Sequence, residues 1–547
     1  MTSYGSSGGV EFALNKRHMP RSQVEAVPID DVDISDDDSS SINPSSLRAN
    51  FLPPNLDLPA LDPTTIDRYG SLHDSSPFFS PVFAHLPSIR PDKLHVASED
   101  AQTLRRKLMR DSNILIIQGG YSGKTFIYER LRDLGVNLYI LDGPDSVWKK
   151  AAEDGLIVDF IELDFTDNDT IFPRAMDAIV DAGLDVQFDA VTTYYEDAVA
   201  LAARIGTAMG LTVNDVEACD RARNKRRTRE VMAVAGLPVP LFQKVLGEED
   251  IPRACEHVGF PLILKPVYGA ASMGVTKAHS TEEAVGAYRK LFKTFDVKED
   301  TIWAQGTEMV IEEFYDGDEF DIDILLSDGI AVYAKVSDNW ACCDPWFQET
   351  GTNCPSLYPQ DKQNELIKLA VDSTLSLGFK YGSFHVECKY TSRGPRMIEV
   401  NARMGGVSVR DANLIAWGVD LVEEHAMAML KIPIRPLFEK PLKYFAESAI
   451  NAPYSGTINT DNWLDFALEN PLVHKISYFK HKGDVVVGPK DSVPDWMAEI
   501  IVVSEENQEE AIKLIRSVMK KAEVPITAKE FETERAFFFP DYAHPFC

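Results

Sequence analysis

Cysteine, basic charge and long apolar runs are all scarce in this sequence. Its 547 residues include seven cysteines, an odd number without the spacing of a zinc site, so we expect a reduced, cytoplasmic protein. Lys and Arg number 55 against 85 Asp and Glu, which gives a net charge of −30. Such a surface repels phosphate backbones and anionic lipid, so we expect no nucleic-acid or membrane partner. No apolar stretch approaches the roughly 20 residues of a membrane helix, and the N-terminus lacks the apolar segment of a signal peptide.

The length indicates several structural units, because single hydrophobic cores stop growing at roughly 250–300 residues. Residues 1–100 differ from the rest, since they combine an acidic run at 30–38, a serine tract at 39–41 and many prolines. Such segments bury too little apolar surface to offset their ordering entropy. We therefore predict a disordered tail rather than an interaction arm, with part of the stretch from Ile66 to Leu94 as a candidate for packing on the folded body.

An α/β unit is predicted to begin near Arg110. The wholly apolar run at residues 114–117 is typical of a buried parallel strand. A glycine-rich turn, a helical pattern and a second strand at 138–141 follow it. This order of elements predicts a parallel sheet with helices on its faces.

A further strand and helix are predicted near the C-terminus. The strand covers residues 500–503, and the helix runs from about 505 to 521 with Ser504 as its candidate N-cap. The helix has an apolar stripe formed by Ile512, Leu514, Ile515, Val518 and Met519.

The glycine-rich turn at residues 119–125 looks like a phosphate-binding P-loop. That loop has the pattern G-x-x-x-x-G-K-[ST], and its first glycine would fall at Gln118. The turn does not match the dinucleotide pattern G-x-G-x-x-G either. We interpret it as a turn that lets a helix pack closely on the sheet, with a lesser substrate contact as the alternative. A P-loop NTPase that uses Lys124 is a weaker alternative.

Lys265 ends a strand pattern and is followed by a loop of small residues at 269–274. A point charge beside closely approaching backbone N–H groups suits a triphosphate. Upstream, six of the nine residues from Arg221 to Arg229 are basic. This basic helix, which includes Lys225, either binds an anion or pairs with acidic neighbours, and the sequence leaves both open.

Acidic residues recur in the segment 310–323, which reads as a strand from Glu319 onward. A carboxylate there is able to accept an adenine amino group or ribose hydroxyls. The alternative is a strand edge whose acidic side chains are only solvated.

Two further strand patterns, 384–390 and 396–403, flank a turn. If the turn is centred on Arg393, Glu387 lies directly opposite Glu399, and opposed like charges destabilise a sheet unless a cation compensates them. Glu387, Glu399 and Asn401 offer oxygen ligands that suit Mg²⁺ bridging nucleotide phosphates. The alternative is a solvated hairpin face. The two-residue period places four side chains on one face of the second strand: Met397, Glu399, Asn401 and Arg403.

Taken in this order, the four clusters resemble those of the ATP-grasp carboxylate–amine ligases, over about residues 113–435. The segments 336–339, 347–351, 399–406 and 410–421 are most similar to the L-amino-acid (dipeptide) ligases and the carnosine-synthase type. The resemblance implies an α/β (α+β) ATP-grasp fold. It places an N-terminal pre-ATP-grasp domain at 101–210, an ATP-grasp domain at 211–435 with a small mobile lobe at about 235–315, and a C-terminal α/β domain at 436–547.

The resemblance also implies roles for individual residues. Arg403 and Lys265 would be catalytic, and Glu387, Glu399 and Asn401 would hold Mg²⁺, with Mn²⁺ as a substitute. The residues that would bind ATP are Lys225, Lys265, Ala271, Ser272, Glu312, Glu313, Phe314, Tyr315 and Glu319. Those that would bind the amino-acid substrate are Glu349, His385, Arg403, Met404, Gly405 and Gly406.

The activity implied is amide-bond formation between a small carboxylate and an amine, with ATP converted to ADP and phosphate through an acyl phosphate. A homodimer is expected from the resemblance alone. The main alternative is a non-catalytic ATP-binding relative with a regulatory role, which would be expected to lose a metal carboxylate or the arginine; Glu387, Glu399 and Arg403 are all present. The residues Cys342 to Trp346 match nothing in the family, and Trp346 either shapes specificity or packs in a loop.

Overall fold

The computed structural model describes residues 86, 89–184, 186–269, 272–295, 305–342, 346–406, 408–491 and 493–528. Most of the predicted tail, with its acidic run, lies outside these residues. Two helices precede Arg110, the expected start of ordered structure: α4 (Pro91–Leu94) and α5 (Glu99–Met109). Leu94 and Met109 are buried in the same core as the first strand, so the folded body begins earlier than the composition indicated.

The N-terminal unit is a parallel four-stranded sheet in the order β3-β2-β1-β4. Its strands are β1 (Asn113–Ile117), β2 (Asn137–Asp142), β3 (Asp159–Glu162) and β4 (Ala190–Thr192). Helices cover both faces: α6 (Thr125–Asp133), α7 (Trp148–Glu153), α8 (Ile171–Asp181) and α9 (Val199–Ala208). Ile114 and Ile116 pack with α6, whereas Leu115 and Ile117 pack with α8 and α9. Burial on both faces explains why this predicted strand is apolar at every position.

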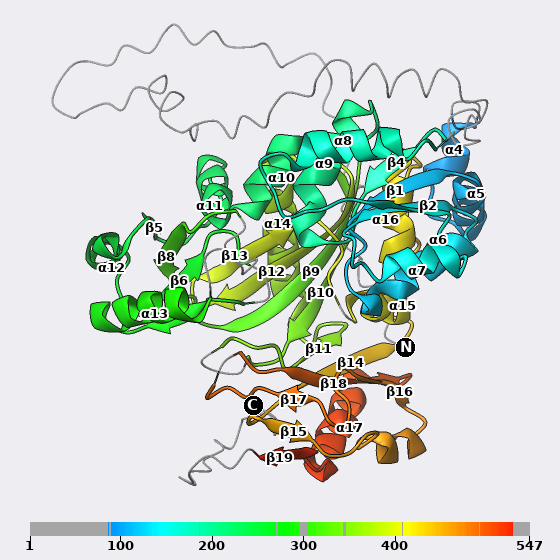
Figure 1. Cartoon of the computed structure of the whole chain (residues 1–547). Coiled ribbons are helices and arrows are strands. Elements are labelled where there is room, and N and C mark those ends of the chain that lie inside the picture. The colour runs from blue at the N-terminus through cyan, green and yellow to red at the C-terminus, as the bar shows by residue number, and fades with distance from the viewer. Residues whose placement is uncertain are drawn as a thin grey trace, which may run out of the picture.

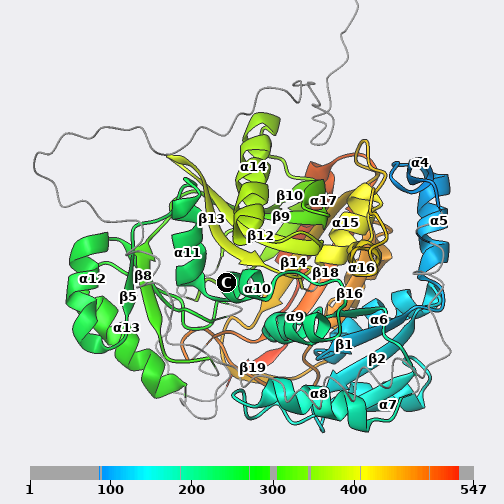
Figure 2. The ribbon, with the colours of Figure 1, turned by 90° about the horizontal axis from the view of Figure 1, so that it is seen from above.

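A small antiparallel sheet, which we call the small lobe, lies on the other side of the molecule (Figures 1 and 2). Its strands follow the order β5-β8-β6-β7 and are β5 (Phe242–Val245), β6 (Leu262–Pro266), β7 (Thr276–Ala278) and β8 (Met309–Glu313). Helices α12 (Ile251–Val258) and α13 (Thr281–Thr294) complete it. These elements enclose a hydrophobic core of their own, which suits a body able to move against the rest.

An eight-stranded antiparallel sheet joins the other parts, in the order β13-β12-β9-β10-β11-β14-β18-β16. Its first five strands are β13 (Gly394–Asn401), β12 (Gly382–Thr391), β9 (Asp318–Ser327), β10 (Ile330–Asn339) and β11 (Gly351–Cys354). Helix α14 (Gln360–Leu377) covers one face through Ile322, Phe384 and Val386. The intervening residues, including Asp321, His385 and Glu387, therefore face the opposite side.

C-terminal strands extend this same sheet. They are β14 (Tyr444–Asn451), β16 (Val473–Tyr478) and β18 (Trp496–Ser504), and a separate three-stranded sheet contains β15 (Gly456–Ile458), β17 (Val485–Val486) and β19 (Ile526–Ala528). The predicted C-terminal helix is α17 (Gln508–Lys521), and its N-cap is Asn507 rather than Ser504. Ser504 still belongs to β18, and its Oγ accepts from the backbone N–H of Glu506, so the chain turns before the helix begins. Leu514 is only partly buried, unlike the rest of the predicted stripe.

Helices α15 (Val409–Trp417) and α16 (Leu421–Met429) fill the space between the large sheet and the N-terminal unit. Their apolar side chains share one core with β1, α6 and Phe445 of β14. None of the helices in the described ranges is long and apolar enough to cross a bilayer.

His425 of α16 links the two large units. Its Nδ1 accepts from the backbone N–H of Ser383 on β12 at 3.0 Å, so Nε2 carries the proton and donates to Thr192 Oγ1 of β4 at 2.7 Å. Burial lowers the pKa of His425 from 6.5 to about 4. The neutral ring is thus the form that the folded protein holds.

We expect this histidine to make the protein sensitive to acid. Below pH 6.5 His425 is protonated in the unfolded chain, whereas in the folded chain it stays neutral down to about pH 4. The free energy of unfolding therefore falls as the pH drops through this window. Between pH 7.5 and pH 5 the loss from this group is about 2 kcal/mol. Urea unfolding of wild type and His425→Gln at both values tests this: the variant is less stable at pH 7.5, and the gap narrows by about that amount at pH 5. A gap that does not change with pH would contradict it.

Candidate active site

A cavity that opens to solvent, with about 980 Å³ of space including its mouth, lies between the small lobe and the large sheet. Side chains of β6 and β8 line it from the small lobe, and those of β12 and β13 line it from the large sheet. The predicted site residues that line it are Lys225, Lys265, Ser272, Glu312, Glu313, Phe314, Tyr315, Glu319, Glu349, Glu387 and Glu399. Segments separated by as many as 174 positions thus meet in one cavity.

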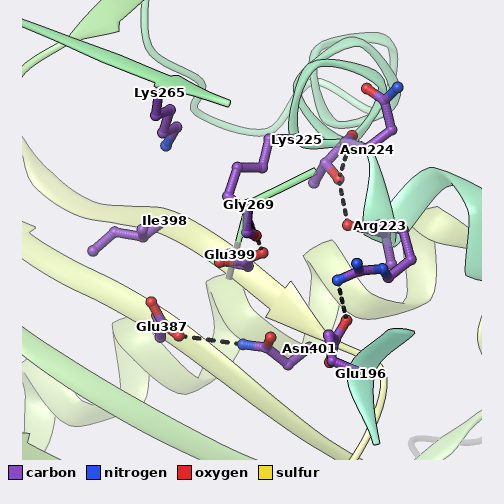
Figure 3. Close-up of polar contacts among 12 residues, drawn as sticks. Glu196, Arg223, Asn224, Lys225, Lys265, Gly269, Glu387, Ile398, Glu399 and Asn401 are labelled. Atoms are coloured by element: carbon purple, nitrogen blue, oxygen red, sulfur yellow. Dashed lines mark hydrogen bonds and ion pairs between the residues drawn. The ribbon is translucent and has the colours of Figure 1, made fainter. Parts of the chain in front are cut away.

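Lys225 is held at the start of a helix. The basic segment is not one helix: α10 (Val216–Arg223) ends at Arg223, and Asn224 caps α11 (Lys225–Val234) by accepting from the backbone N–H of Arg227. The Nζ of Lys225 donates to the carbonyl of Gly269 at 2.6 Å and to Glu399 at 2.7 Å (Figure 3). Lys225 therefore joins the small-residue loop to the large sheet.

All six basic side chains of the segment have an acidic partner. The partners are Glu217 for Arg221 and Arg227, Glu196 and Asp197 for Arg223, Glu399 for Lys225, Glu230 and Glu308 for Arg226, and Glu312 for Arg229. Of the two interpretations of the segment, pairing with acidic neighbours is thus the one that the structure shows. Lys225 alone among the six lines the cavity.

Lys265 and Glu312 form a buried ion pair across β6 and β8. Arg229, also buried, reaches the same carboxylate at 3.2 Å. Burial would raise the pKa of Glu312, yet the two cations lower it to about 2. Within this group of three side chains, two cations share one carboxylate, so a phosphate is able to become the partner of one of them.

The predicted pairing of Glu387 with Glu399 is confirmed by the register of β12 and β13. A bulge follows immediately, because Cys388 pairs with Met397 and Ile398 is the extra residue. Met397 consequently lies in the core under α14, and Ile398 lines the cavity. The expectation that Met397 shares a face with Glu399 was wrong for this reason.

The pKa values of the two opposed carboxyl groups shift in opposite directions. Burial, Glu399 and Asp321 raise the pKa of Glu387 to about 8. Burial acts in the same direction on Glu399, but Lys225 and Lys265 lower the pKa of Glu399 below its usual value. Asn401 donates to Glu387 Oε1 at 3.2 Å. The His385 ring lowers the pKa of Glu387, but among the described residues no Lys or Arg forms an ion pair with it, as expected of a carboxylate that awaits a cation.

The donor set fits a hard cation. Glu387, Glu399 and the amide oxygen of Asn401 are oxygen ligands that lie together beside the cavity. Within the described residues, no three His, Cys, Asp or Glu side chains are arranged to hold a metal by themselves. A metal ion at this place would therefore need oxygen atoms from a bound phosphate as well.

Two predicted residues, His385 and Arg403, lie beyond the hairpin carboxylates. His385 Nδ1 contacts Asp323 at 2.9 Å, and Nε2 lies 3.6 Å from Asp321. Burial alone would lower the pKa of His385, because it disfavours the charged ring. The two aspartates outweigh burial and raise the pKa of His385 to about 10. Arg403 pairs through Nε with Glu196 at 2.8 Å. Glu196 lies in the N-terminal unit, so Arg403 sits where that unit meets the large sheet.

The remaining predicted residues have diverse surroundings. Glu313 pairs with Arg393, Glu319 lies 3.7 Å from Lys389, and the ammonium of Lys277 lies 3.9 Å from the ring centre of Phe314. Ala271 falls outside the described residues.

The predicted segment 404–406 approaches the site mainly by its backbone. Met404 is buried in the apolar core, and its carbonyl accepts from Arg403 at 2.9 Å. A Cβ at Gly405 would lie 2.7 Å from His385 Nδ1, so only glycine lets the chain pass this close, whereas Gly406 has no such neighbour. Trp346 donates to the carbonyl of Pro489 at 2.7 Å and lies under Lys290 of α13, so it packs between the small lobe and the C-terminal segment.

The P-loop-like turn serves packing. The N–H of Gly119 donates to Asp142, and the carbonyl of Gly120 accepts from Trp148 of α7. A Cβ at Gly119 would overlap the Trp148 ring. Lys124 donates to the carbonyl of Tyr194, and burial together with Arg403 lowers the pKa of Lys124 to about 8. This matches the interpretation as a tight turn, and it leaves Lys124 on the Arg403 side of the site.

Sequence reasoning missed several contributors, among them Glu196, Arg229, Asp321 and Lys389. Arg229 was within the basic segment, and Asp321 was within the acidic strand, so local signals existed but did not show that these side chains would contact the predicted site residues Glu312 and His385. Glu196 carried no signal, because its partner Arg403 is more than 200 positions away.

Comparison with known proteins gives concordant results. A family model described as an ATP-grasp domain matches residues 258–411. The chain is 28% identical to human carnosine synthase 1 over 360 residues, covering 62% of this chain and 42% of that protein. It is 28% identical to the alanine–anticapsin ligase of Bacillus subtilis over 255 residues, covering 43% of this chain and 52% of that protein. The chain thus spans less than half the length of the carnosine synthases that it matches.

Solved structures show the same fold. The L-amino acid ligase of Bacillus licheniformis superposes with a TM-score of 0.63 at 23% identity, covering 77% of this chain and all of that one. An N5-carboxyaminoimidazole synthase of Aspergillus clavatus, solved in complex with ADP, gives a TM-score of 0.58 at 15% identity, covering 75% of this chain and 98% of that one. This chain therefore contains an ATP-grasp domain and has the fold of the ATP-grasp ligases, with the carnosine synthases and bacterial alanine–anticapsin ligases among its relatives.

Proposed function

We propose that this protein is an ATP- and Mg²⁺-dependent ligase that joins a small carboxylate, such as an amino acid, to an amine. The observation that carries the proposal is the meeting of Lys225, Lys265 and the opposed pair Glu387–Glu399 around one cavity. Cations that attract phosphate thus face carboxylates that attract a metal. The carnosine synthases, alanine–anticapsin ligase and dapdiamide A synthase, whose names denote this kind of coupling, are relatives.

ATP would enter between the small lobe and the large sheet. Lys225 and Lys265 would bind its phosphates, and Ala271 and Ser272 would close over them. Glu312 would accept from the adenine amino group, Glu313, Phe314 and Tyr315 would line the base pocket, and Glu319 would bind the ribose. Lys265 would exchange Glu312 for a phosphate. Glu312 would still have a cationic partner, because it keeps its ion pair with Arg229.

The metal residues would be Glu387, Glu399 and Asn401. Bound Mg²⁺, for which Mn²⁺ substitutes, would supply charge neutralisation for the transferring phosphoryl group. Glu399 would give up its contact with Lys225, which then turns to a phosphate. Glu387 would lose its proton on binding the metal, because its raised pKa comes largely from burial and the opposed Glu399.

The chemistry would take place beyond the hairpin carboxylates, on the side of Arg403. The substrate carboxylate would attack the γ-phosphorus, the bond to ADP would break, and Arg403 would stabilise the charge on the transferred group. The amine of the second substrate would then attack the acyl carbon, lose a proton and expel phosphate. Glu349, His385 and the segment 404–406 would shape the amino-acid pocket. Closure of the small lobe would exclude water, which otherwise hydrolyses the acyl phosphate.

A non-catalytic ATP-binding role is the second candidate, and it is disfavoured because both lysines and both opposed carboxylates line one cavity and the arginine is present as well. A P-loop NTPase is disfavoured because the N–H of Gly119 and the carbonyl of Gly120 are already bonded within the fold. A cytoplasmic location and a homodimer stay predictions from the sequence.

A phosphate-release screen tests the proposal. The full chain with ATP and Mg²⁺ is given pairs drawn from the twenty amino acids, β-alanine, γ-aminobutyrate and taurine, and product masses are recorded. We expect release that requires an amino compound and yields ADP plus a mass equal to the two substrates minus water. Binding of ATP without amine-dependent release across the panel would instead favour the non-catalytic candidate.

A further inference from the structure

The face of the large sheet that carries the metal-binding residues continues into the C-terminal strands. Side chains two residues apart on a strand share a face, and so do residues paired across strands. Following these pairs from β12 to β14 gives Glu387, Asp321, Ser337, Asn339, Thr352 and Glu447. Glu499 of β18 pairs with Ala449, two residues beyond Glu447. Glu447 and Glu499 are therefore diagonal neighbours on the face that bears Glu387.

These two glutamates have unused acceptor atoms. Glu447 is 5% exposed and Glu499 is 2% exposed. Among the described residues, neither Glu447 Oε1 nor Glu499 Oε2 has a hydrogen-bond partner. The other oxygen of Glu499 accepts from Lys475 at 3.1 Å and from Ser477 at 2.8 Å. Two neighbouring glutamates thus each bury a carboxylate oxygen without a hydrogen-bond donor. Burying an unpaired acceptor costs free energy unless a ligand supplies the donor.

A third acceptor lies on the same strand as Glu447. The Nδ2 of Asn451 donates to the carbonyl of Glu349 at 2.7 Å, which fixes the orientation of the amide, and its Oδ1 has no partner within the described chain. The unpartnered atoms on these strands are therefore all acceptors. A ligand that satisfies them must bring several N–H or O–H donors.

The cluster is hydrogen-bonded to a residue of the cavity lining, because Asn451 donates to the carbonyl of Glu349 and Glu349 lines the cavity. Burial, Glu499 and Glu349 raise the pKa of Glu447 well above its usual value, and Glu349 lines the cavity. The two charged groups that shift the pKa of Glu447, Glu499 and Glu349, are both acidic, so neither compensates the charge of its carboxylate.

We propose that Glu447 and Glu499 form a subsite for a non-reacting ammonium group of an amino-acid substrate. This subsite rests on the proposed function, because it would bind a charged group of the amino-acid substrate that reacts near Arg403. An ammonium carries one positive charge and three donors, which matches two carboxylates and an amide oxygen that lack donors. A metal ion matches less well, since no three His, Cys, Asp or Glu side chains in the described ranges are arranged to hold one.

Isothermal titration calorimetry of the full chain with matched compounds tests the subsite. β-Alanine and propionate differ only in the ammonium beside the reacting carboxylate. L-Lysine and L-norleucine differ only in a side-chain ammonium. We expect the ammonium member of one pair to bind at least tenfold more tightly, and that pair identifies which nitrogen is held. Glu447→Gln and Glu499→Gln should abolish the preference, whereas Glu509→Gln, an exposed charge on α17, should retain it.

Glutamine has nearly the shape of glutamate, so the Glu447 and Glu499 variants should both fold, and circular dichroism verifies this. Equal binding within both pairs, a preference that survives in both glutamate variants, or no measurable binding of any of the four compounds would each overturn the subsite. Amide formation in the phosphate-release screen is read separately. Failure of that screen with the binding preference intact would count against the proposed reaction and not against the subsite.

Discussion

Replacing Glu399 with glutamine is expected to lower the rate of product formation at least about 10³-fold, equivalent to about 4 kcal/mol of transition-state stabilisation. Glutamine keeps the size of the side chain but removes the charge that faces both Glu387 and Lys225. A metal ion would then be held by one carboxylate instead of two. Steady-state phosphate release and product mass, measured over a range of Mg²⁺ concentrations, give the result.

The loss should come from the metal and not from the fold. Lys225 keeps its bond to the carbonyl of Gly269 in the variant, so the small-residue loop stays anchored. Glu509→Gln removes the same charge from an exposed position on α17 and should retain full activity. If Glu399→Gln keeps more than about a tenth of the wild-type rate at saturating Mg²⁺, the assignment of the metal residues is wrong.

Replacing Lys265 with methionine is expected to weaken ATP binding by about 100-fold. Hydrogen bonds to charged groups are worth about 1.5–3 kcal/mol, and Lys265 would supply such a bond to a phosphate in a buried site. Methionine fills a similar volume, and Glu312 keeps Arg229 as its partner, so the ion pair of the small lobe is not left uncompensated. Titration with ATP, followed by calorimetry, measures the change in Kd.

Lys124→Met is the matched control for this experiment. Both lysines are partly or fully buried and both donate to a protein acceptor, but Lys124 contacts the carbonyl of Tyr194 in the N-terminal unit. We expect its ATP affinity to stay within about threefold of wild type, which is below 1 kcal/mol. The reverse pattern, with Lys124 essential and Lys265 dispensable, would restore the P-loop alternative.

The sequence alone determined the local parts of this site. The pairing of Glu387 with Glu399 was predictable because a short turn sets the register of a hairpin. The buried parallel strand at residues 114–117 was predictable because a strand covered on both faces is apolar throughout. Lys265 was identified because a strand end followed by small residues is itself a local pattern.

Only the tertiary structure decided the contacts between distant segments. The bulge at Ile398 reversed the face of Met397, since one extra residue shifts a two-residue alternation. Glu196 reached Arg403, and Glu447 joined the face of Glu387, through the packing of units far apart in the chain. Turn lengths and side-chain periods are local quantities that a sequence displays. Which strand edges pair, and which charges then meet, depends on the packing of the whole chain, because many arrangements satisfy the same local patterns.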